Sequence, residues 1–225
     1  MAGPSLPNES AEYRTMRDGL LVAETALRDQ TEQVAALRRA LPPGGTLPQD
    51  FEFEERTPSG VARVRLSELF DPGRNTLLIY GFMFGPEMQS ACPMCNSFLD
   101  SLNAAVPHLR QRVSLALCGQ SPIERVADFG TSRGWSQLRL ISSAQNDYAR
   151  ANHTEAEDGS QLPMANVFVR GEDCIRHFWS SELLFSPLPN GNSRHIDLLW
   201  PLWNVLDVGP EGRGDHWYPS LDYQS

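Results

Sequence analysis

The residues best suited to chemistry are two cysteines, Cys92 and Cys95, in the order Cys-Pro-Met-Cys. The apolar run TLLIYGF at 76–82 precedes them, and helical spacing follows at 98–109. Thiols at the start of a helix meet unpaired backbone N–H groups and the positive end of the helix dipole, which stabilise a thiolate. We predict that Cys92 has a lowered pKa and acts as the nucleophile. Cys95, one turn further along, would resolve the mixed disulfide.

Metal binding and inert packing are the alternatives for this cysteine pair. A Cys-x-x-Cys pair is also half of a zinc site, but the other cysteines, Cys118 and Cys174, are single and far apart in the sequence. Two buried, unreactive thiols would have the same spacing. A structural zinc site and inert thiols therefore remain alternatives to redox chemistry.

Three methionines near the pair, Met83, Met88 and Met94, raise the alternative of copper. Soft sulfur ligands favour Cu(I), although methionine also fills irregular gaps in a core. His108 could shuttle protons because its unperturbed pKa is close to neutral, or it could be a solvent-facing residue at a helix end. Glu87 could modulate the thiols or lie exposed on a loop.

Several aromatic side chains could form an apolar groove near the thiols, although core packing is the default for strand positions. They are Tyr80, Phe82, Phe84, Trp135 and Trp179.

The remaining pattern predicts the elements that position the pair. Ser121-Pro122-Ile123-Glu124 has the form of a capping box and predicts a helix that runs to about Arg133. We predict hairpins over 51–65 and 165–179, buried strands at 113–117 and 138–141, and a last helix over 195–206. Such alternation of strands and helices indicates an α/β fold with a central sheet.

The N-terminal segment predicts one long helix over residues 10–41 with a heptad seam. Its apolar positions are Tyr13, Met16, Leu20, Ala23, Leu27, Val34, Leu37 and Leu41. The seam could lie along the same chain or pair with a second copy in a homodimer. We accordingly divide the chain into an N-terminal helical extension, 1–45, and a second domain, 46–225.

Composition narrows the class of protein. The chain has 225 residues, a formal net charge of -9 and a pI near 5.0, which argue against nucleic acid and anionic membranes as partners. It contains no apolar run of the roughly 20 residues that a bilayer span needs, and its start lacks the apolar core of a secretory signal. Only 4 cysteines argue against a disulfide-stapled secreted domain. We expect a cytoplasmic protein without a bound cofactor.

Several stretches resemble a bacterial thioredoxin-like family known as a domain of unknown function, over about residues 12–223. They are Tyr80-Gly81-Phe82-Met83-Phe84-Gly85-Pro86, Cys92-Pro93-Met94-Cys95, Val106-Pro107-His108-Leu109, Gly134-Trp135, Ile141-Ser142-Ser143, Trp200-Pro201-Leu202-Trp203-Asn204 and the helix end Leu37-Arg38-Arg39-Ala40-Leu41-Pro42. The resemblance implies a thioredoxin-like fold and a Cys-x-x-Cys site, but no substrate.

A thioredoxin-like fold would also give a role to Pro163, which precedes a predicted strand. Such proteins place a cis proline there, facing the dithiol, although cis is the minority form of X–Pro bonds in general. We predict a cis bond between Leu162 and Pro163. Together with Pro93 and Met94, these two residues would bind an extended substrate.

The function that follows is thiol–disulfide exchange with a disulfide-containing protein or a small-molecule thiol. A copper(I)-binding module and a non-catalytic interaction protein are the alternatives, as is a peroxiredoxin-type peroxidase. The peroxidase pattern has threonine or serine three residues before the nucleophile. Here Gln89 occupies that position, and Ser90 is displaced by one.

Overall fold

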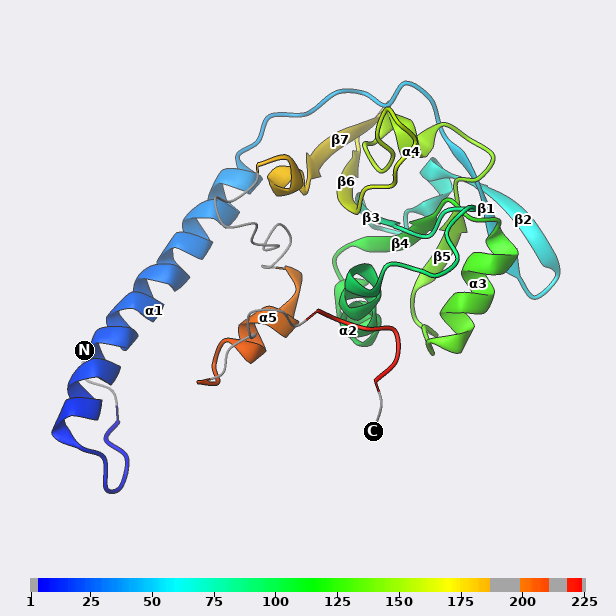
Figure 1. The fold of residues 1–225 in the computed structure, drawn as a ribbon. Coiled ribbons are helices and arrows are strands. Elements are labelled where there is room, and N and C mark those ends of the chain that lie inside the picture. Colours follow the sequence, from blue (N-terminus) through cyan, green and yellow to red (C-terminus); the bar gives the residue numbers. More distant parts are fainter. Residues whose placement is uncertain (1–3, 187–198, 211–217, 224–225) are drawn as a thin grey trace. The chain divides into compact units, whose positions relative to one another are not determined.

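The computed structural model describes residues 4–186, 199–210 and 218–223 (Figure 1). The chain forms two compact units, Met1–Pro43 and Gly44–Ser225. The division falls near the predicted boundary at 45.

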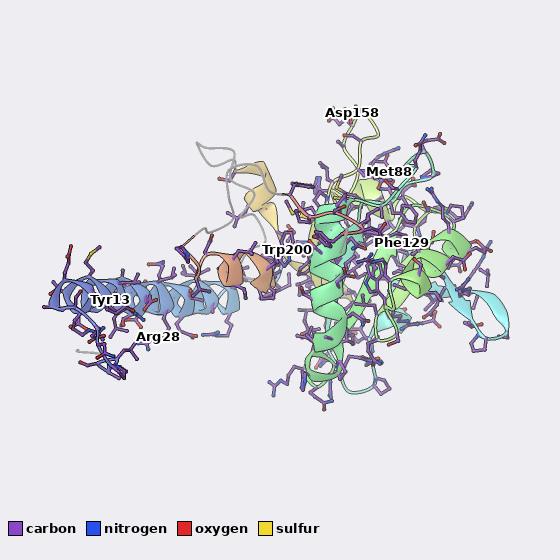
Figure 2. The ribbon with its side chains drawn as sticks, turned by 60° about the horizontal axis from the view of Figure 1, so that its bottom comes forward. Tyr13, Arg28, Met88, Phe129, Asp158 and Trp200 are labelled. Atoms are coloured by element: carbon purple, nitrogen blue, oxygen red, sulfur yellow. The ribbon has the colours of Figure 1, made fainter. Side chains whose placement is uncertain are left out.

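The first unit is built on one helix, α1 (Ala11–Arg39), as the heptad pattern predicts. It begins after Ser10, whose side-chain oxygen accepts a hydrogen bond from the Tyr13 N–H at 3.0 Å. None of its residues is buried, and Figure 2 shows Tyr13 and Arg28 among the side chains that surround it. The apolar seam is therefore open, and its pairing with a second copy stays a prediction.

The second unit contains the remaining elements. The strands are β1 (Glu52–Thr57), β2 (Gly60–Arg65), β3 (Thr76–Phe82), β4 (Ser114–Gly119), β5 (Arg139–Ser142), β6 (Met164–Arg170) and β7 (Ile175–Ser180). The helices are η1 (Leu66–Leu69), α2 (Pro93–Leu109), α3 (Ile123–Ser132), α4 (Tyr148–Ala151), η2 (Glu182–Phe185) and α5 (Pro201–Leu206). The two predicted hairpins, β1–β2 and β6–β7, are confirmed.

The strands form one sheet in the order β2-β1-β5-β4-β3-β6-β7. Strands β3, β4 and β5 are parallel, and β6 and β7 join beside β3 as an antiparallel hairpin. Helix α2 connects β3 to β4, as a parallel pair requires. A parallel β–α–β unit flanked by such a hairpin, with two cysteines where the helix begins, is the thioredoxin-like arrangement. The predicted fold class is therefore confirmed.

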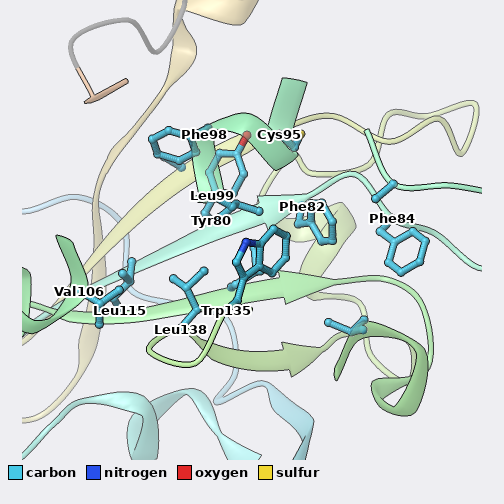
Figure 3. Close-up of a cluster of buried hydrophobic side chains, with 14 of the residues drawn as sticks. Tyr80, Phe82, Phe84, Cys95, Phe98, Leu99, Val106, Leu115, Trp135 and Leu138 are labelled. Atoms are coloured by element: carbon cyan, nitrogen blue, oxygen red, sulfur yellow. The ribbon is translucent and has the colours of Figure 1, made fainter. Parts of the chain in front are cut away.

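Alternation along the central strands divides the core between the two faces of the sheet. Tyr80 and Phe82 in β3 face one cluster, which includes residues of α2, α3 and α5. Leu77 and Ile79 face the other, which includes residues of β1, η1 and α4. The dithiol lies on the first face, where Cys95 belongs to the buried cluster (Figure 3).

The predicted capping box at the start of α3 is wrong. The helix begins at Ile123 after Pro122, and no side chain caps it. The hydroxyl of Ser121 instead accepts a hydrogen bond from Arg125 at 3.2 Å, and its N–H binds the Phe84 carbonyl at 3.0 Å. Burial of Ser121 against the neighbouring loop therefore overrides the local capping pattern.

The predicted C-terminal helix over 195–206 is only partly within the described residues, where α5 covers its last six positions. Residues 195–198 lie outside them. Trp200, labelled in Figure 2, is buried. Its ring packs against Phe98 of α2, with ring centroids 6.2 Å apart. None of the helices in the described ranges has both the length and the apolar composition that a bilayer span demands.

Candidate active site

The two thiols lie at the start of α2 and differ in exposure. Cys92 is the residue before the helix, with extended backbone (φ -64°, ψ 120°), and Pro93 is its first residue. Cys92 is half-buried, whereas Cys95 is 2% exposed. The Cys92 N–H binds the Met83 carbonyl at 3.1 Å, and its own carbonyl accepts the Asn96 N–H at 3.0 Å. The backbone thus fixes Cys92 at both of its peptide groups.

Hydrogen-bond donors around Cys92 favour its charged form. A hydrogen bond from the Cys95 thiol is the main cause that lowers the pKa of Cys92 to about 6. Partial burial opposes this shift, while the N–H groups of Cys95 and Met94 and the Tyr218 hydroxyl add to it. The N–H groups at the helix start therefore lower the pKa of Cys92, as predicted, but their effect is smaller than that of the Cys95 thiol.

Cys95 has the opposite environment. The hydrogen bond with Cys92 and deep burial raise the pKa of Cys95 well above its ordinary value. The Tyr80 hydroxyl and the Met83 N–H lower it in part. At neutral pH the pair therefore holds one thiolate, on the more open sulfur, and one thiol, on the shielded sulfur.

Tyr80 supplies a phenol beside the inner thiol. It is 1% exposed, in β3, and its ring packs against Phe98 with centroids 4.9 Å apart. Figure 3 shows its hydroxyl oxygen directed toward Cys95. Burial is the main cause that raises the pKa of Tyr80, so the phenol stays protonated and can donate a hydrogen bond. The sequence identified Tyr80 only as a core or groove residue.

Tyr218 supplies a second phenol, beside the outer thiol. It lies in the described segment 218–223, and its hydroxyl hydrogen-bonds to Cys92. Arg133, just after α3, holds this segment through a 2.6 Å hydrogen bond to the Leu221 carbonyl. No local motif marks Tyr218, because its place in the site depends on a contact between residues 126 positions apart in the sequence.

The loop between β3 and the dithiol is fastened to α3 by one side chain. The Arg125 guanidinium donates to the carbonyls of Gly85 at 3.0 Å, Pro86 at 3.1 Å and Met88. It also stacks on the Phe84 ring, 4.3 Å from its centroid. Arg125 therefore holds the loop between β3 and Cys92 through the backbone carbonyls of the loop.

The three methionines near the thiols have packing or loop roles. The Met88 sulfur accepts a hydrogen bond from the Gly85 N–H at 3.3 Å. Met83 and Met94 are partly buried and pack against the core cluster. Among the described residues, no group of three or more histidine, cysteine or acidic side chains could hold a metal ion.

The predicted cis bond at Pro163 is wrong, because the described residues contain no cis peptide. The Leu162 N–H binds the Thr154 carbonyl at 3.0 Å, and the chain reaches β6 with the ordinary trans form. Met164 pairs with Gly81, so Pro163 lies beside the end of β3 that leads to the dithiol. Contact of Leu162 and Pro163 with substrate stays a prediction, as it does for Pro93 and Met94.

Other predicted residues lie away from the thiols or inside the core. His108 is exposed near the far end of α2, about 24 Å along the helix from Cys92, so a proton shuttle is wrong. Cys118 faces the other side of the sheet, where burial raises its pKa to about 12. Cys174 lies in the β6–β7 turn, and Glu87 is exposed.

The aromatic residues that could have formed a groove pack in or against the core, and Trp179 is the one that is only partly buried. Those that belong to the buried cluster or pack against it are Tyr80, Phe82, Phe84, Trp135 and Trp179.

Comparisons with known proteins match the chain to one family. The family described as "Bacterial protein of unknown function (DUF899)" matches residues 4–224. No curated protein matches the chain.

Solved structures that the comparison matches to this chain include peroxidoxin BcpB from Mycobacterium tuberculosis. It is 20% identical, with a TM-score of 0.47, over 71% of this chain and 94% of that one. AhpC from Enterococcus faecalis is 14% identical, with a TM-score of 0.45, over 59% of this chain and 77% of that one. The assignment of the fold rests on the strand order and on the position of the two cysteines.

Proposed function

The chain belongs to the bacterial family DUF899, and from its own dithiol we propose that it is a thiol–disulfide oxidoreductase. The proposal rests mainly on one observation: the two cysteines, one helical turn apart, differ in exposure and in pKa. Cys92 is accessible, with a pKa of about 6, and Cys95 is buried, with a raised pKa. One sulfur is thus prepared to attack, and the other is kept as a thiol until it is needed.

The first step is attack by the Cys92 thiolate on one sulfur of a substrate disulfide. A Cys92–substrate disulfide forms, the substrate S–S bond breaks, and the other substrate sulfur leaves as a thiolate that takes a proton from water. The donors around Cys92 then have no charge to stabilise, and the Cys95 thiol loses its hydrogen-bond partner.

The second step is attack by Cys95 on the Cys92 sulfur. Cys95 gives its proton to solvent, the Cys92–Cys95 bond forms, and the substrate sulfur leaves as a thiolate that is then protonated. The substrate disulfide has gained two electrons from the protein and two protons from solvent, and the protein, which began as one thiolate and one thiol, has lost two electrons and the one proton of Cys95. Reversal of the same steps would oxidise a substrate dithiol.

A direct test is the reaction of the reduced protein with oxidised glutathione, followed by mass spectrometry. We expect one intramolecular Cys92–Cys95 disulfide and release of two glutathione thiols. The same result is expected for a Cys118→Ala, Cys174→Ser variant, which keeps only the dithiol. An unreacted dithiol with both glutathione and a protein disulfide such as insulin would reject the proposal.

The same preparation tests the alternatives. Consumption of hydrogen peroxide without reaction with disulfides would indicate a peroxidase. Tight Cu(I) binding by redox-inert thiols would indicate a metal module, although Met88 already uses its sulfur within its own loop. Inert thiols without metal binding would leave an interaction protein. We place the proposed exchange in the cytoplasm, where thiols are kept reduced. The low cysteine content of the chain fits such a compartment.

A further inference from the structure

Each sulfur of the dithiol has its own phenol. Tyr80, 1% exposed, directs its hydroxyl from β3 toward Cys95 (Figure 3), and the hydroxyl of Tyr218, 55% exposed, hydrogen-bonds to Cys92 from the segment 218–223 that Arg133 holds. Deep burial raises the pKa of Tyr80, and partial burial together with the charge of the neighbouring thiols raises the pKa of Tyr218, so both phenols stay protonated and can donate at neutral pH. The inner donor is sealed from water and the outer one is open to it.

The segment that carries Tyr218 is anchored without help from its hydroxyl. The Arg133 guanidinium reaches the Leu221 carbonyl at 2.6 Å with one nitrogen and the Asp100 carboxylate at 2.7 Å with another. Asp100 is on α2, the helix that begins beside Cys92, and Pro219 is buried. Removal of the Tyr218 hydroxyl should therefore leave the segment in place.

We propose that the two tyrosines serve different steps of the exchange: Tyr218 stabilises Cys92 as attacking and leaving thiolate, and Tyr80 stabilises Cys95 as it attacks the mixed disulfide. This inference rests on the proposed function. It assigns a catalytic role to two residues outside the Cys-x-x-Cys motif.

The two tyrosines have different roles because the negative charge lies on a different sulfur in each step. In the first step, negative charge leaves Cys92 for the departing substrate sulfur, so Tyr218 acts on the reactant thiolate. In the second step, Cys95 loses its proton to solvent and its charge passes to the substrate thiolate. Cys92 is then uncharged, so Tyr80 is the side-chain donor that remains beside the attacking sulfur. In the reverse reaction, each phenol stabilises the same sulfur as a leaving group.

Two conservative variants separate the roles, each with a matched control. Tyr218→Phe is compared with Tyr223→Phe in the same segment, where the hydroxyl accepts the Ser220 N–H at 3.3 Å. Tyr80→Phe is compared with Tyr148→Phe, another fully buried tyrosine, whose ring packs in the cluster on the opposite face of the sheet. The readouts are the pH midpoint of Cys92 alkylation by iodoacetamide and the lifetime of the glutathione mixed disulfide.

We expect Tyr218→Phe to raise the Cys92 midpoint by about 0.5–1 pH unit, because it loses one hydrogen bond to a charged sulfur. Alkylation at pH 6 should then slow about two- to fivefold, as the thiolate fraction falls. Tyr80→Phe should move this midpoint less and prolong the mixed disulfide about tenfold, since resolution requires the Cys95 thiolate.

A midpoint for Tyr218→Phe equal to that of Tyr223→Phe would overturn the role of Tyr218. A mixed-disulfide lifetime for Tyr80→Phe equal to that of Tyr148→Phe would overturn the role of Tyr80. Failure of the proposed function gives a different result, because the parent protein would then form no mixed disulfide. The alkylation midpoint needs no disulfide substrate and still decides the role of Tyr218.

Discussion

The backbone N–H of Cys92 donates a hydrogen bond to the carbonyl oxygen of Met83, over 3.1 Å. The loop between β3 and α2 is thereby closed at its base, and Arg125 holds its backbone carbonyls from α3. The position of the thiolate is thus set by main-chain contacts, which side-chain substitutions at the cysteines leave intact. Substitution of one cysteine should therefore leave the other in place, so that the two sulfurs can be tested separately.

The reactivity of the two thiols should depend on pH in different ways. The Cys92 pKa is lowered to about 6, so its thiolate is present above that pH and is lost as the pH falls through it. Alkylation of Cys92 should rise from pH 5 to 7 with a midpoint near 6 and then level off, whereas Cys95 should stay unmodified across this range. Peptide mass mapping after brief iodoacetamide pulses measures both. Equal labelling of the two cysteines would contradict the assignment.

Serine substitutions at the two cysteines should differ in kind. Cys92→Ser removes the nucleophile and should abolish disulfide reduction, because Cys95 is buried and protonated. Cys95→Ser should still form a mixed disulfide and then retain it, since no resolving thiol remains. Non-reducing gels and intact mass spectra after exposure to oxidised glutathione distinguish them. Adducts that accumulate on Cys92→Ser instead would reverse the roles.

Asp100 should contribute measurably to the stability of the second unit. Its carboxylate accepts hydrogen bonds from Trp135 Nε1 at 2.8 Å, Arg133 at 2.7 Å and Asn96 at 3.1 Å. Asp100→Ala leaves the indole N–H of buried Trp135 without this acceptor and should lower the free energy of unfolding by about 2 kcal/mol. Urea denaturation followed by tryptophan fluorescence measures the loss. Asp100→Asn keeps an acceptor oxygen and should lose less; equal losses would show that the acceptor oxygen is not what matters.

The open seam of α1 leads to a prediction of a homodimer. Leu20 and Leu27 lie on the seam and are 52% and 66% exposed. Leu20→Glu with Leu27→Glu should convert the dimer to a monomer, because charges would face the paired helix. Val22→Glu, at an exposed position off the seam, is the matched control and should remain dimeric. Sedimentation velocity decides, and a monomeric parent protein would remove the prediction.

The local pattern of the sequence predicted most strands and the dithiol helix. The TLLIYGF run gives β3 with the predicted bounds, and the Gly171-Glu172-Asp173 turn gives the β6–β7 hairpin. These features depend on neighbouring residues, so the sequence carries them directly. The position of β1 next to β5 could not be predicted, since the pairing joins segments far apart in the chain.

The same limit applies to the site. The spacing of Cys92 and Cys95 carries the thiol chemistry, but Tyr218 meets Cys92 only because Arg133 anchors a distant segment. Two predictions were wrong: the capping box at Ser121, which was based on a local sequence pattern, and the cis bond at Pro163, which was based on the thioredoxin-like fold. At Ser121, the N–H binds the carbonyl of Phe84, 37 residues earlier in the chain. At Pro163, the preceding Leu162 N–H binds the Thr154 carbonyl across a loop.

The pairing of β1 with β5 also governs how the domain can be assembled. Glu54 of β1 lies opposite Ser142 of β5, which comes 88 residues later in the chain. A two-stranded hairpin alone is marginally stable in water, so β1 and β2 gain little before β5 arrives. Contacts between segments this far apart slow folding, because a long loop must close first. During synthesis, the edge of β1 that pairs with β5 in the folded protein therefore stays unpaired until residues 139–142 have been made, and an unpaired strand edge can pair with another chain.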